Sequence, residues 1–415
     1  MNIKEINIER NLNMNESILS DMYSRFKNLR KNEYSKDIPL DHFLVTQQEL
    51  KNMNIKFDIV KEKNKDRLYI HDKGKRIFRY TKSFYPNNTS FGFQVANDKI
   101  LTERYLSYAN IKTTNSKLFT VDEYDIAFEY VMNCKKKLVI KPLALDGGLG
   151  VFIDITPSNF DYFWNECISA QNRRKVKNPK IILQDFIPGF EVRMIINEGA
   201  FMSATLRVPA HVRGDGKHSI KELIKMKNTE RKKNPLLKSH PIKINNGLVQ
   251  LLKYKKLKLE DILSNEEFCI LYPQSNLQHG GENIEISNLI NEEVKQQSVD
   301  AVTAIPGLHT SGVDIMLENF DSVQGTIIEV NKAPAFLLNY YPYIGKPQNP
   351  MKYIFKSLII ESRILRNILD IKELDDLDLN ILINRFKYNY LKQQRLEKTI
   401  QKLETENEKL RRLVK

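Results

Sequence analysis

Alternating apolar and polar positions predict β-strands most clearly in the last third of the chain. Residues 312–317 and 326–331 are two runs rich in valine and isoleucine, and the polar residues 318–325 between them have the composition of a turn. We therefore predict a β-hairpin over residues 312–331.

The two strands of this hairpin carry oxygen-bearing side chains. Since side chains alternate faces along a strand, Glu329 and Asn331 share one face, while Ile328 and Val330 are expected to point into a core. Asp314 on the partner strand can reach the polar face. Two carboxylates and an amide suit a hard cation such as Mg²⁺. The alternative is an ordinary hairpin with a polar solvent face.

A second predicted hairpin encloses a glycine-rich loop. Residues 137–142 form an apolar run that ends in a lysine and a proline, residues 146–150 contain three glycines, and residues 151–155 are apolar again. Strand, glycine loop and strand differ from the nucleotide-binding motifs in which a helix follows the loop. Backbone N–H groups in such a loop can still bind phosphate, although many such loops are plain turns.

Helical periodicity dominates the two ends of the chain. Residues 18–29 have an amphipathic pattern, and residues 98–106 begin with Asn97 or Asp98 as an N-cap. Near the C-terminus, apolar residues recur at alternating steps of four and three, with one asparagine among them. This pattern favours a short parallel two-stranded coiled coil and therefore a homodimer. The alternative is an amphipathic helix packed on its own domain. The heptad positions are Leu396, Ile400, Leu403, Asn407, Leu410 and Val414.

Composition narrows the class of protein. The 415 residues suffice for two or three domains, and the net charge is +14, with basic residues dense between 221 and 258. No nucleic-acid-binding motif accompanies the charge, so a nucleic-acid partner is not favoured. Three separated cysteines argue against disulfides and zinc. Without a signal sequence or a run of about eighteen apolar residues, we expect a cytoplasmic protein that does not enter the membrane.

Taken together, motifs in a fixed order resemble those of the ATP-grasp carboxylate–amine ligases, in particular the ATP-grasp modules of cyanophycin synthetases and bifunctional glutathione synthetases. The resemblance extends from about residue 98 to residue 347. Its motifs are Asp98-Lys99 with Leu101-Thr102, Val139-Ile140-Lys141-Pro142, residues 146–151, Gly189-Phe190-Glu191-Val192-Arg193, Arg207-Val208-Pro209-Ala210, residues 214–220, Gly280-Gly281, Gly312-Val313-Asp314 and Ile328-Glu329-Val330-Asn331.

The resemblance implies a role for each of the site residues. Lys99 and Lys141 would contact ATP phosphates, and the loop with Gly147, Gly148, Gly150 and Val151 would cover them as a lid. Gln184, Asp185, Phe186 and Ile187 would line the adenine, and Glu191 would accept hydrogen bonds from the ribose. Asp314, Glu329 and Asn331 would hold one or two Mg²⁺ ions, for which Mn²⁺ could substitute, and Arg193 and Arg207 would neutralise the transferred phosphoryl group.

The implied activity is an ADP-forming ligase that joins a carboxylate to an amine through an acyl phosphate, with an amino acid or peptide as substrate. An alternative from another class is a nucleotide-binding scaffold or regulatory protein without ligase activity. The intact acidic set at Asp314 and Glu329 favours the enzyme.

The implied fold is of the α/β (α+β) class, with two ATP-grasp subdomains gripping ATP between antiparallel sheets. We expect four parts: an N-terminal α/β region, a subdomain with the glycine loop, a subdomain with the metal-binding hairpin, and a helical tail ending in the coiled coil. Their expected boundaries are residues 1–95, 96–183, 184–348 and 349–415.

Overall fold

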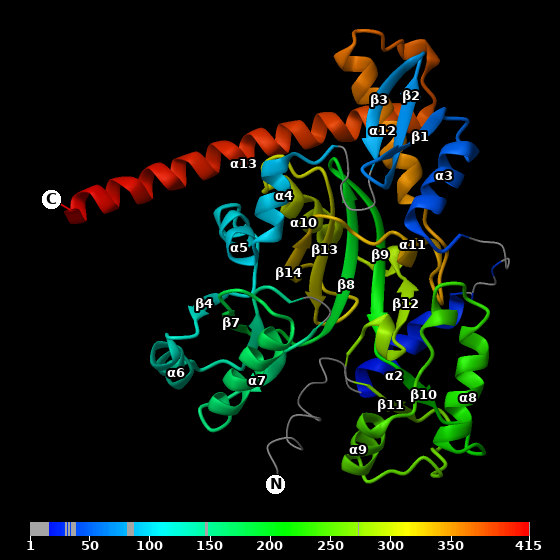
Figure 1. Cartoon of the computed structure of the whole chain (residues 1–415), viewed down its shortest axis with the longest axis vertical. Coiled ribbons are helices and arrows are strands. Elements are labelled where there is room, and N and C mark those ends of the chain that lie inside the picture. Colours follow the sequence, from blue (N-terminus) through cyan, green and yellow to red (C-terminus); the bar gives the residue numbers. More distant parts are fainter. Residues whose placement is uncertain are drawn as a thin grey trace.

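The computed structural model describes residues 16–29, 31, 34, 39–80, 87–145, 148–272 and 274–414, with side chains as far as residue 412. Two antiparallel sheets lie side by side, and a long C-terminal helix runs out from the body (Figure 1). The polar N-terminus from which the localisation was predicted lies outside the described residues.

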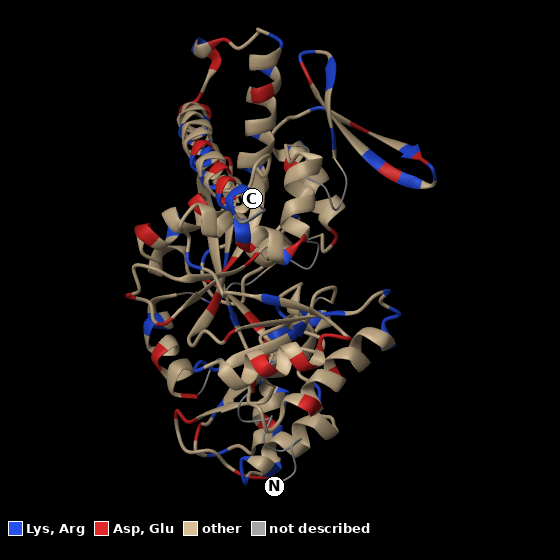
Figure 2. Cartoon of the chain, turned by 90° about the vertical axis from the view of Figure 1, so that its left-hand side faces the viewer, with Lys and Arg blue, Asp and Glu red and all other residues tan. Residues whose placement is uncertain are grey.

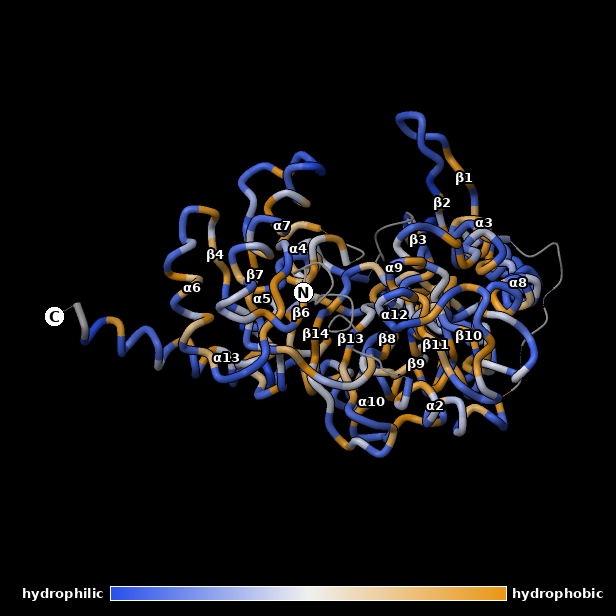
Figure 3. Tube along the Cα trace, turned by 90° about the horizontal axis from the view of Figure 1, so that it is seen from below, coloured by the Kyte–Doolittle hydropathy of each residue, from blue (hydrophilic) through white to orange (hydrophobic). Residues whose placement is uncertain are grey.

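The larger sheet has five antiparallel strands in the order β12-β9-β8-β13-β14. Its strands are β8 (Phe190–Asn197), β9 (Ala200–Val208), β12 (Glu282–Glu285), β13 (Thr310–Leu317) and β14 (Thr326–Asn331). One face of this sheet is apolar and packs against helices. Hydrophobic residues are frequent along its central strands (Figure 3). The helices on that core are α2 (Glu16–Arg25), α4 (Ser90–Asn97), α5 (Lys99–Tyr108) and α10 (Glu292–Thr303).

The predicted hairpin at residues 312–331 is confirmed, but one side chain of it was misplaced. The β13–β14 register pairs Asp314 with Glu329 and Ile315 with Ile327, so Ile328 is an extra residue in a β-bulge. A bulge reverses the alternation of faces. Ile327 and Val330 therefore lie in the core, whereas Ile328 is only half-buried.

The smaller sheet carries the glycine loop. It has the order β4-β7-β5-β6, and β5 and β6 form the predicted hairpin. Its strands are β4 (Lys117–Thr120), β5 (Leu138–Pro142), β6 (Phe152–Ile155) and β7 (Lys180–Asp185). Helices α6 (Tyr124–Asn133) and α7 (Phe160–Arg173) cover it with an aromatic core that includes Phe160, Phe163 and Trp164.

Two smaller units flank the larger sheet. The first is a three-stranded sheet of β1 (Phe57–Glu62), β2 (Lys65–Asp72) and β3 (Lys75–Tyr80) that shares a core with α3 (His42–Asn52) and α12 (Pro350–Leu365). The second lies between β9 and β12 and contains β10 (His211–Arg213), β11 (Phe268–Ile270), α8 (Ile220–Arg231) and α9 (Asn246–Tyr254). A capping box of Ser219 and Glu222 fixes the start of α8.

The expected domain boundaries stay a prediction. Helix α5, at the start of the expected second unit, contacts β14 of the larger sheet, as does α4, which crosses the expected boundary at residue 95. After the short helix α11 (Leu337–Tyr340), helices α12 and α13 (Asp376–Val414) end the chain.

Helix α13 presents the predicted heptad face to solvent. Ile400, Leu403 and Leu410 are 52%, 46% and 60% exposed, and basic and acidic residues alternate along the helix (Figure 2). The structure contains a single chain, so the coiled coil stays a prediction. Within the described residues, no helix has the length and apolar character needed to span a membrane.

Candidate active site

Strand register brings the predicted metal and arginine side chains together on the polar face of the larger sheet. Asp314 on β13 lies between Arg193 on β8 and Glu329 on β14. Both Nε and Nη2 of Arg193 donate to the Asp314 carboxylate, the latter at 2.6 Å. Asp314 and Arg193 are 4% and 8% exposed, so this is a buried, bidentate ion pair.

The two other predicted metal ligands, Glu329 and Asn331, carry oxygen atoms that can bind a cation beside Asp314. Asn331 donates from Nδ2 to Asp314 Oδ2 at 3.1 Å, which leaves its carbonyl oxygen as an acceptor. Within the described part of the chain, the Glu329 carboxylate has no hydrogen-bond donor and no cation within 4.0 Å. No cluster of three His, Cys, Asp or Glu side chains suited to a metal occurs among the described residues. The predicted set has two carboxylates and one amide, and this oxygen-donor chemistry fits Mg²⁺.

Glu191 and Arg207 complete this group, which we name the Asp314 cluster (Glu191, Arg193, Arg207, Asp314 and Glu329). Arg207 on β9 donates from Nη1 to Glu191 Oε1 at 2.9 Å. Burial and the nearby charge of Asp314 raise the pKa of Glu191. Burial opposes ionisation of Asp314, but Arg193 and Arg207 together hold its pKa below the usual value.

The two predicted phosphate-binding lysines approach this cluster from other elements. Asp98 caps α5 by accepting from the N–H groups of Ile100 and Leu101, which fixes Lys99 in the first turn. Lys141 lies on β5 and is buried. Burial and the charge of Lys99 lower the pKa of Lys141 to about 8, while Glu329 and Glu103 oppose this shift. Lys141 therefore senses charges from both α5 and the hairpin of the larger sheet.

The glycine loop next to Lys141 is described from Gly148 onward, and Gly147 lies outside the described residues. Gly148 and Gly150 have φ angles of +78° and +71°, which L side chains rarely adopt. At Gly150 a Cβ atom would also lie 2.9 Å from Pro142 Cγ. The Val151 N–H donates to the Gly148 carbonyl at 3.4 Å and closes the turn.

The predicted adenine segment, residues 184–187, begins with the last two residues of β7 and continues beyond the strand. Gln184 and Asp185 are buried, and Asp185 accepts from Lys136 Nζ at 2.6 Å. The N–H groups of Asp185 and Phe186 donate to the carbonyls of Thr114 and Lys137, whereas no backbone partner is recorded for the Ile187 N–H within the described chain.

One polar residue of this region was not predicted. Glu103 accepts from the Ser116 N–H at 2.8 Å and from its hydroxyl at 2.7 Å, and the same hydroxyl oxygen lies 3.5 Å from Gln184 Oε1. Glu103 thus connects α5 with the segment that precedes β4. It follows Lys99 by four residues on one helix, and this spacing was the available signal.

Comparison with known proteins gives two kinds of match. No family model matches the chain. The chain is 28% identical over 278 residues to the glutathione biosynthesis bifunctional protein GshAB of Enterococcus faecalis, covering 64% of this chain and 36% of that protein. It is 31% identical over 223 residues to the cyanophycin synthetase of Crocosphaera subtropica, covering 51% of this chain and 24% of that protein.

A crystal structure matches a still larger part of the chain. The bifunctional glutathione synthetase from Pasteurella multocida superposes with a TM-score of 0.58 at 23% identity, covering 77% of this chain and 43% of that one. The chain has the ATP-grasp fold. It is a homologue of these synthetases, as the sequence motifs predicted.

The ATP-grasp match covers only part of the relatives. The chain spans 36% of the glutathione protein and 24% of the cyanophycin synthetase, so the remainder of each relative has no counterpart in the match.

Proposed function

We propose that the chain is an ATP- and Mg²⁺-dependent ligase that forms an amide bond between a carboxylate and an amine, with release of ADP and phosphate. The Asp314 cluster supports this proposal most directly. It combines two arginines with the Glu329 carboxylate, which has no partner among the described residues, and the carbonyl oxygen of neighbouring Asn331 lies beside it. Lys99 and Lys141 add positive charge from the other side.

The nucleotide would lie between the two sheets. Lys99 and Lys141 would contact its phosphates, and the loop containing Gly147, Gly148, Gly150 and Val151 would cover them. Glu191 would accept from the ribose hydroxyls. The strand end at residues 184–187 would hold the adenine through the Ile187 N–H and neighbouring carbonyl groups.

Asp314, Glu329 and Asn331 would hold one or two Mg²⁺ ions, and Mn²⁺ could substitute for them because it accepts the same oxygen ligands. Bound metal would supply positive charge that offsets the charge on the β- and γ-phosphates. Arg193 and Arg207 are the described arginines that pair with the carboxylates of this site, so we assign them to the transferred phosphoryl group.

The chemistry needs no side-chain nucleophile. A substrate carboxylate oxygen attacks the γ-phosphorus, the bond to the β-phosphate oxygen breaks, and ADP leaves an acyl phosphate behind. An amine nitrogen then attacks the acyl carbon, loses a proton and displaces inorganic phosphate, giving the amide. Catalysis by positioning and charge neutralisation is sufficient for such phosphoryl transfer.

We also propose the four-part division at residues 95, 183 and 348, and a homodimer formed through α13. The substrates are proposed to be amino acids or peptides, as the names of the relatives suggest for glutathione and cyanophycin.

The test is a substrate screen with purified full chain. ATP and Mg²⁺ are incubated with amino acids and acidic peptides, and we expect ADP release together with a product whose mass equals the sum of the two substrates minus water. Glu329→Gln should lower turnover by roughly 10³-fold or more, because a metal ligand supplies several kcal/mol of transition-state stabilisation.

The matched control is Glu318→Gln, which removes an exposed carboxylate from the turn of the same hairpin and should keep full activity. Nucleotide binding without ADP release under any acceptor would favour the scaffold alternative. Equal rates in wild type and Glu329→Gln would refute the metal assignment.

A further inference from the structure

A cleft outside the nucleotide site lies where α2, β10 and α8 meet. Its volume is about 380 Å³, within the usual range for ligand pockets. Aromatic and aliphatic side chains form its walls, among them Tyr23, Phe26, Met226 and Tyr343. We name it the Tyr23 cleft.

The charged residues that line the Tyr23 cleft are mostly basic. Among the described residues, Lys27, Lys31, Arg213 and Lys227 line it, and Glu230 is the one carboxylate beside them. Lys27 and Lys31 are exposed at the rim and form no ion pair with any acidic side chain that the structure describes. Lys31 Nζ lies 5.8 Å from the centre of the Tyr343 ring. The cleft therefore has a surplus of positive charge.

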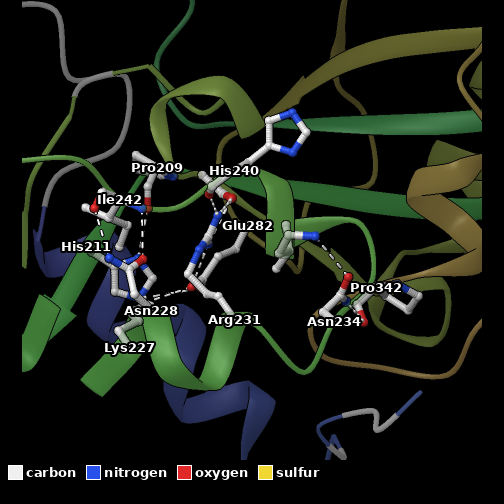
Figure 4. A network of polar contacts seen from close by, with 12 residues as sticks. Pro209, His211, Lys227, Asn228, Arg231, Asn234, His240, Ile242, Glu282 and Pro342 are labelled. Atoms are coloured by element: carbon white, nitrogen blue, oxygen red, sulfur yellow. Dashed lines mark hydrogen bonds and ion pairs between the residues drawn. The ribbon is translucent and has the colours of Figure 1, made fainter. Parts of the chain in front are cut away.

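His211 and Lys227, which line the cleft, belong to a network of polar contacts with Arg231 and Glu282 (Figure 4). We name it the Glu282 cluster (His211, Lys227, Arg231 and Glu282). Glu282 is 1% exposed, and its Oε1 lies 3.0 Å from Lys227 Nζ and 3.4 Å from Arg231 Nη1. Tyr23 donates to its other oxygen at 3.1 Å. One carboxylate thus faces two cations, of which Arg231 is buried and Lys227 is partly exposed.

Lys227 retains one unused donor toward the cleft. His211 donates from Nδ1 to the Pro209 carbonyl at 2.8 Å, so its Nε2 accepts from Lys227 Nζ at 2.9 Å. This neutral tautomer agrees with the pKa of His211, which burial and Lys227 lower to about 4. With His211 and Glu282 taking two ammonium hydrogens, the third has no acceptor among the described residues.

The Tyr23 cleft is separate from the Asp314 cluster. Arg207 pairs with Asn283, and Val208 pairs with Glu282, so Glu282 points to the opposite face of the sheet from Arg207. Glu282 also lies on the edge strand β12, four strands from β14 with its Glu329. Four strand spacings of about 4.8 Å and the thickness of the sheet lie between the two.

We propose that the Tyr23 cleft binds a segment of acidic peptide. Carboxylates spaced along a chain match separate lysine ammonium groups at Lys27, Lys31 and Lys227, and the aliphatic parts of Asp or Glu side chains match the apolar walls. If the chain is a ligase as proposed, acidic peptide is the substrate class that it extends or modifies. The use of the peptide as a substrate rests on the proposed function, whereas its binding to the cleft does not.

The test measures binding of fluorescein-labelled hexaglutamate to the full chain by fluorescence anisotropy at low ionic strength. We expect saturable binding that persists when a non-hydrolysable ATP analogue and Mg²⁺ are present in excess. Lys27→Glu/Lys31→Glu should weaken binding at least tenfold, because like charges then face each other at the rim. Both positions are exposed, so the variant should fold normally.

The matched control is Lys221→Glu/Lys225→Glu, which makes the same change in net charge at exposed positions of α8 that do not line the cleft. Its affinity should stay within about twofold of wild type. Equal weakening by both variants, no binding by wild type, or preferential binding of a hexathymidylate would overturn the proposal. None of these readouts needs turnover, so they are independent of the ligase test.

Discussion

The Asp314 cluster and the Glu282 cluster both include carboxylates of the larger sheet, but opposite charges are left unpaired in the two. In the Asp314 cluster three carboxylates face two guanidinium groups, and Glu329 has no partner among the described side chains. In the Glu282 cluster one carboxylate faces Lys227 and Arg231, while His211 is neutral. The Asp314 cluster therefore has unpaired acceptor oxygens, and the Glu282 cluster has an unpaired donor hydrogen, among the described residues.

The sign of the unpaired charge indicates the kind of ligand. Buried charge is costly unless it is paired, so a surplus acceptor beside arginines suits a cation and the phosphates it accompanies. A surplus ammonium hydrogen in an apolar cleft suits an anion. The same comparison separates structural from functional charge, since Glu282 has three protein donors and Glu329 has none in the described chain.

The largest effect on stability is expected for Glu282→Gln. Removing this charge leaves the buried Arg231 and its neighbour Lys227 without a carboxylate, which typically costs about 3–5 kcal/mol. Burial opposes ionisation, but Lys227 and Arg231 lower the pKa of Glu282 to about 2. The stabilisation that ionised Glu282 provides is therefore complete above the pKa of this group in the unfolded chain, and it is lost as the pH falls toward 2. Urea unfolding at pH 7 and at pH 3 measures both effects.

Asp314→Asn is the matched control for this comparison. Glu191 and Glu329 also act on Arg193 and help to raise its pKa, so the arginine keeps nearby negative charge after the substitution. We expect a loss of about 1–2 kcal/mol in the free energy of unfolding. A loss as large as that for Glu282→Gln would show that the Asp314 cluster depends on its central carboxylate as strongly as the Glu282 cluster does.

A smaller effect is expected from the titration of Lys141. Its pKa of about 8 lies below the ordinary lysine value, so the ammonium group loses its proton as the pH rises through 8. Phosphate binding needs the charged form, so the Kd for Mg-ATP should rise about tenfold from pH 7.5 to pH 9. Isothermal titration calorimetry across this range measures the change.

Lys141→Arg tests the origin of that dependence. A guanidinium group stays charged at pH 9, so its binding curve should be nearly flat over the same range. An unchanged slope in this variant would assign the titration to another group.

The sequence predicted the parts of the fold that depend on local pattern. Alternation placed both hairpins, and the N-cap at Asp98 placed α5. It did not place the bulge at Ile328, because the extra residue becomes visible only when two strands are paired.

From the sequence we could predict only that Arg193 and Asp314 belong to the same site. Their direct pairing depends on a strand register that joins residues 121 positions apart. No pattern in the sequence predicted the Tyr23 cleft. Tyr23 reaches Glu282 across 259 positions, and no local pattern relates an N-terminal helix to the edge of a sheet. Basic density between residues 221 and 258 was the nearest signal, yet only Lys227 of that segment lines the cleft as a cation.

The least effect on either cluster is expected from changes in the outer half of α13. Lys402 Nζ contacts Asn110 Oδ1 at 3.0 Å and Tyr108 donates to Glu406 Oε2 at 3.1 Å, so one side of the helix is held against α5. Ile400 and Leu403 lie on the adjoining side and remain about half exposed. If a second copy covers this side, Leu403→Lys places a charge in the dimer core and should convert the dimer to a monomer.

Sedimentation analysis of Leu403→Lys against Gln401→Lys separates this contact from a general charge effect, since Gln401 is exposed and lies outside the heptad core. Nucleotide affinity should be the same in both variants because neither position reaches the sheets. If Leu403→Lys is still a dimer, the dimer contact is expected in the first half of α13. There Ile383 and Phe386, which are 67% and 76% exposed, form a second apolar stripe that faces away from the body.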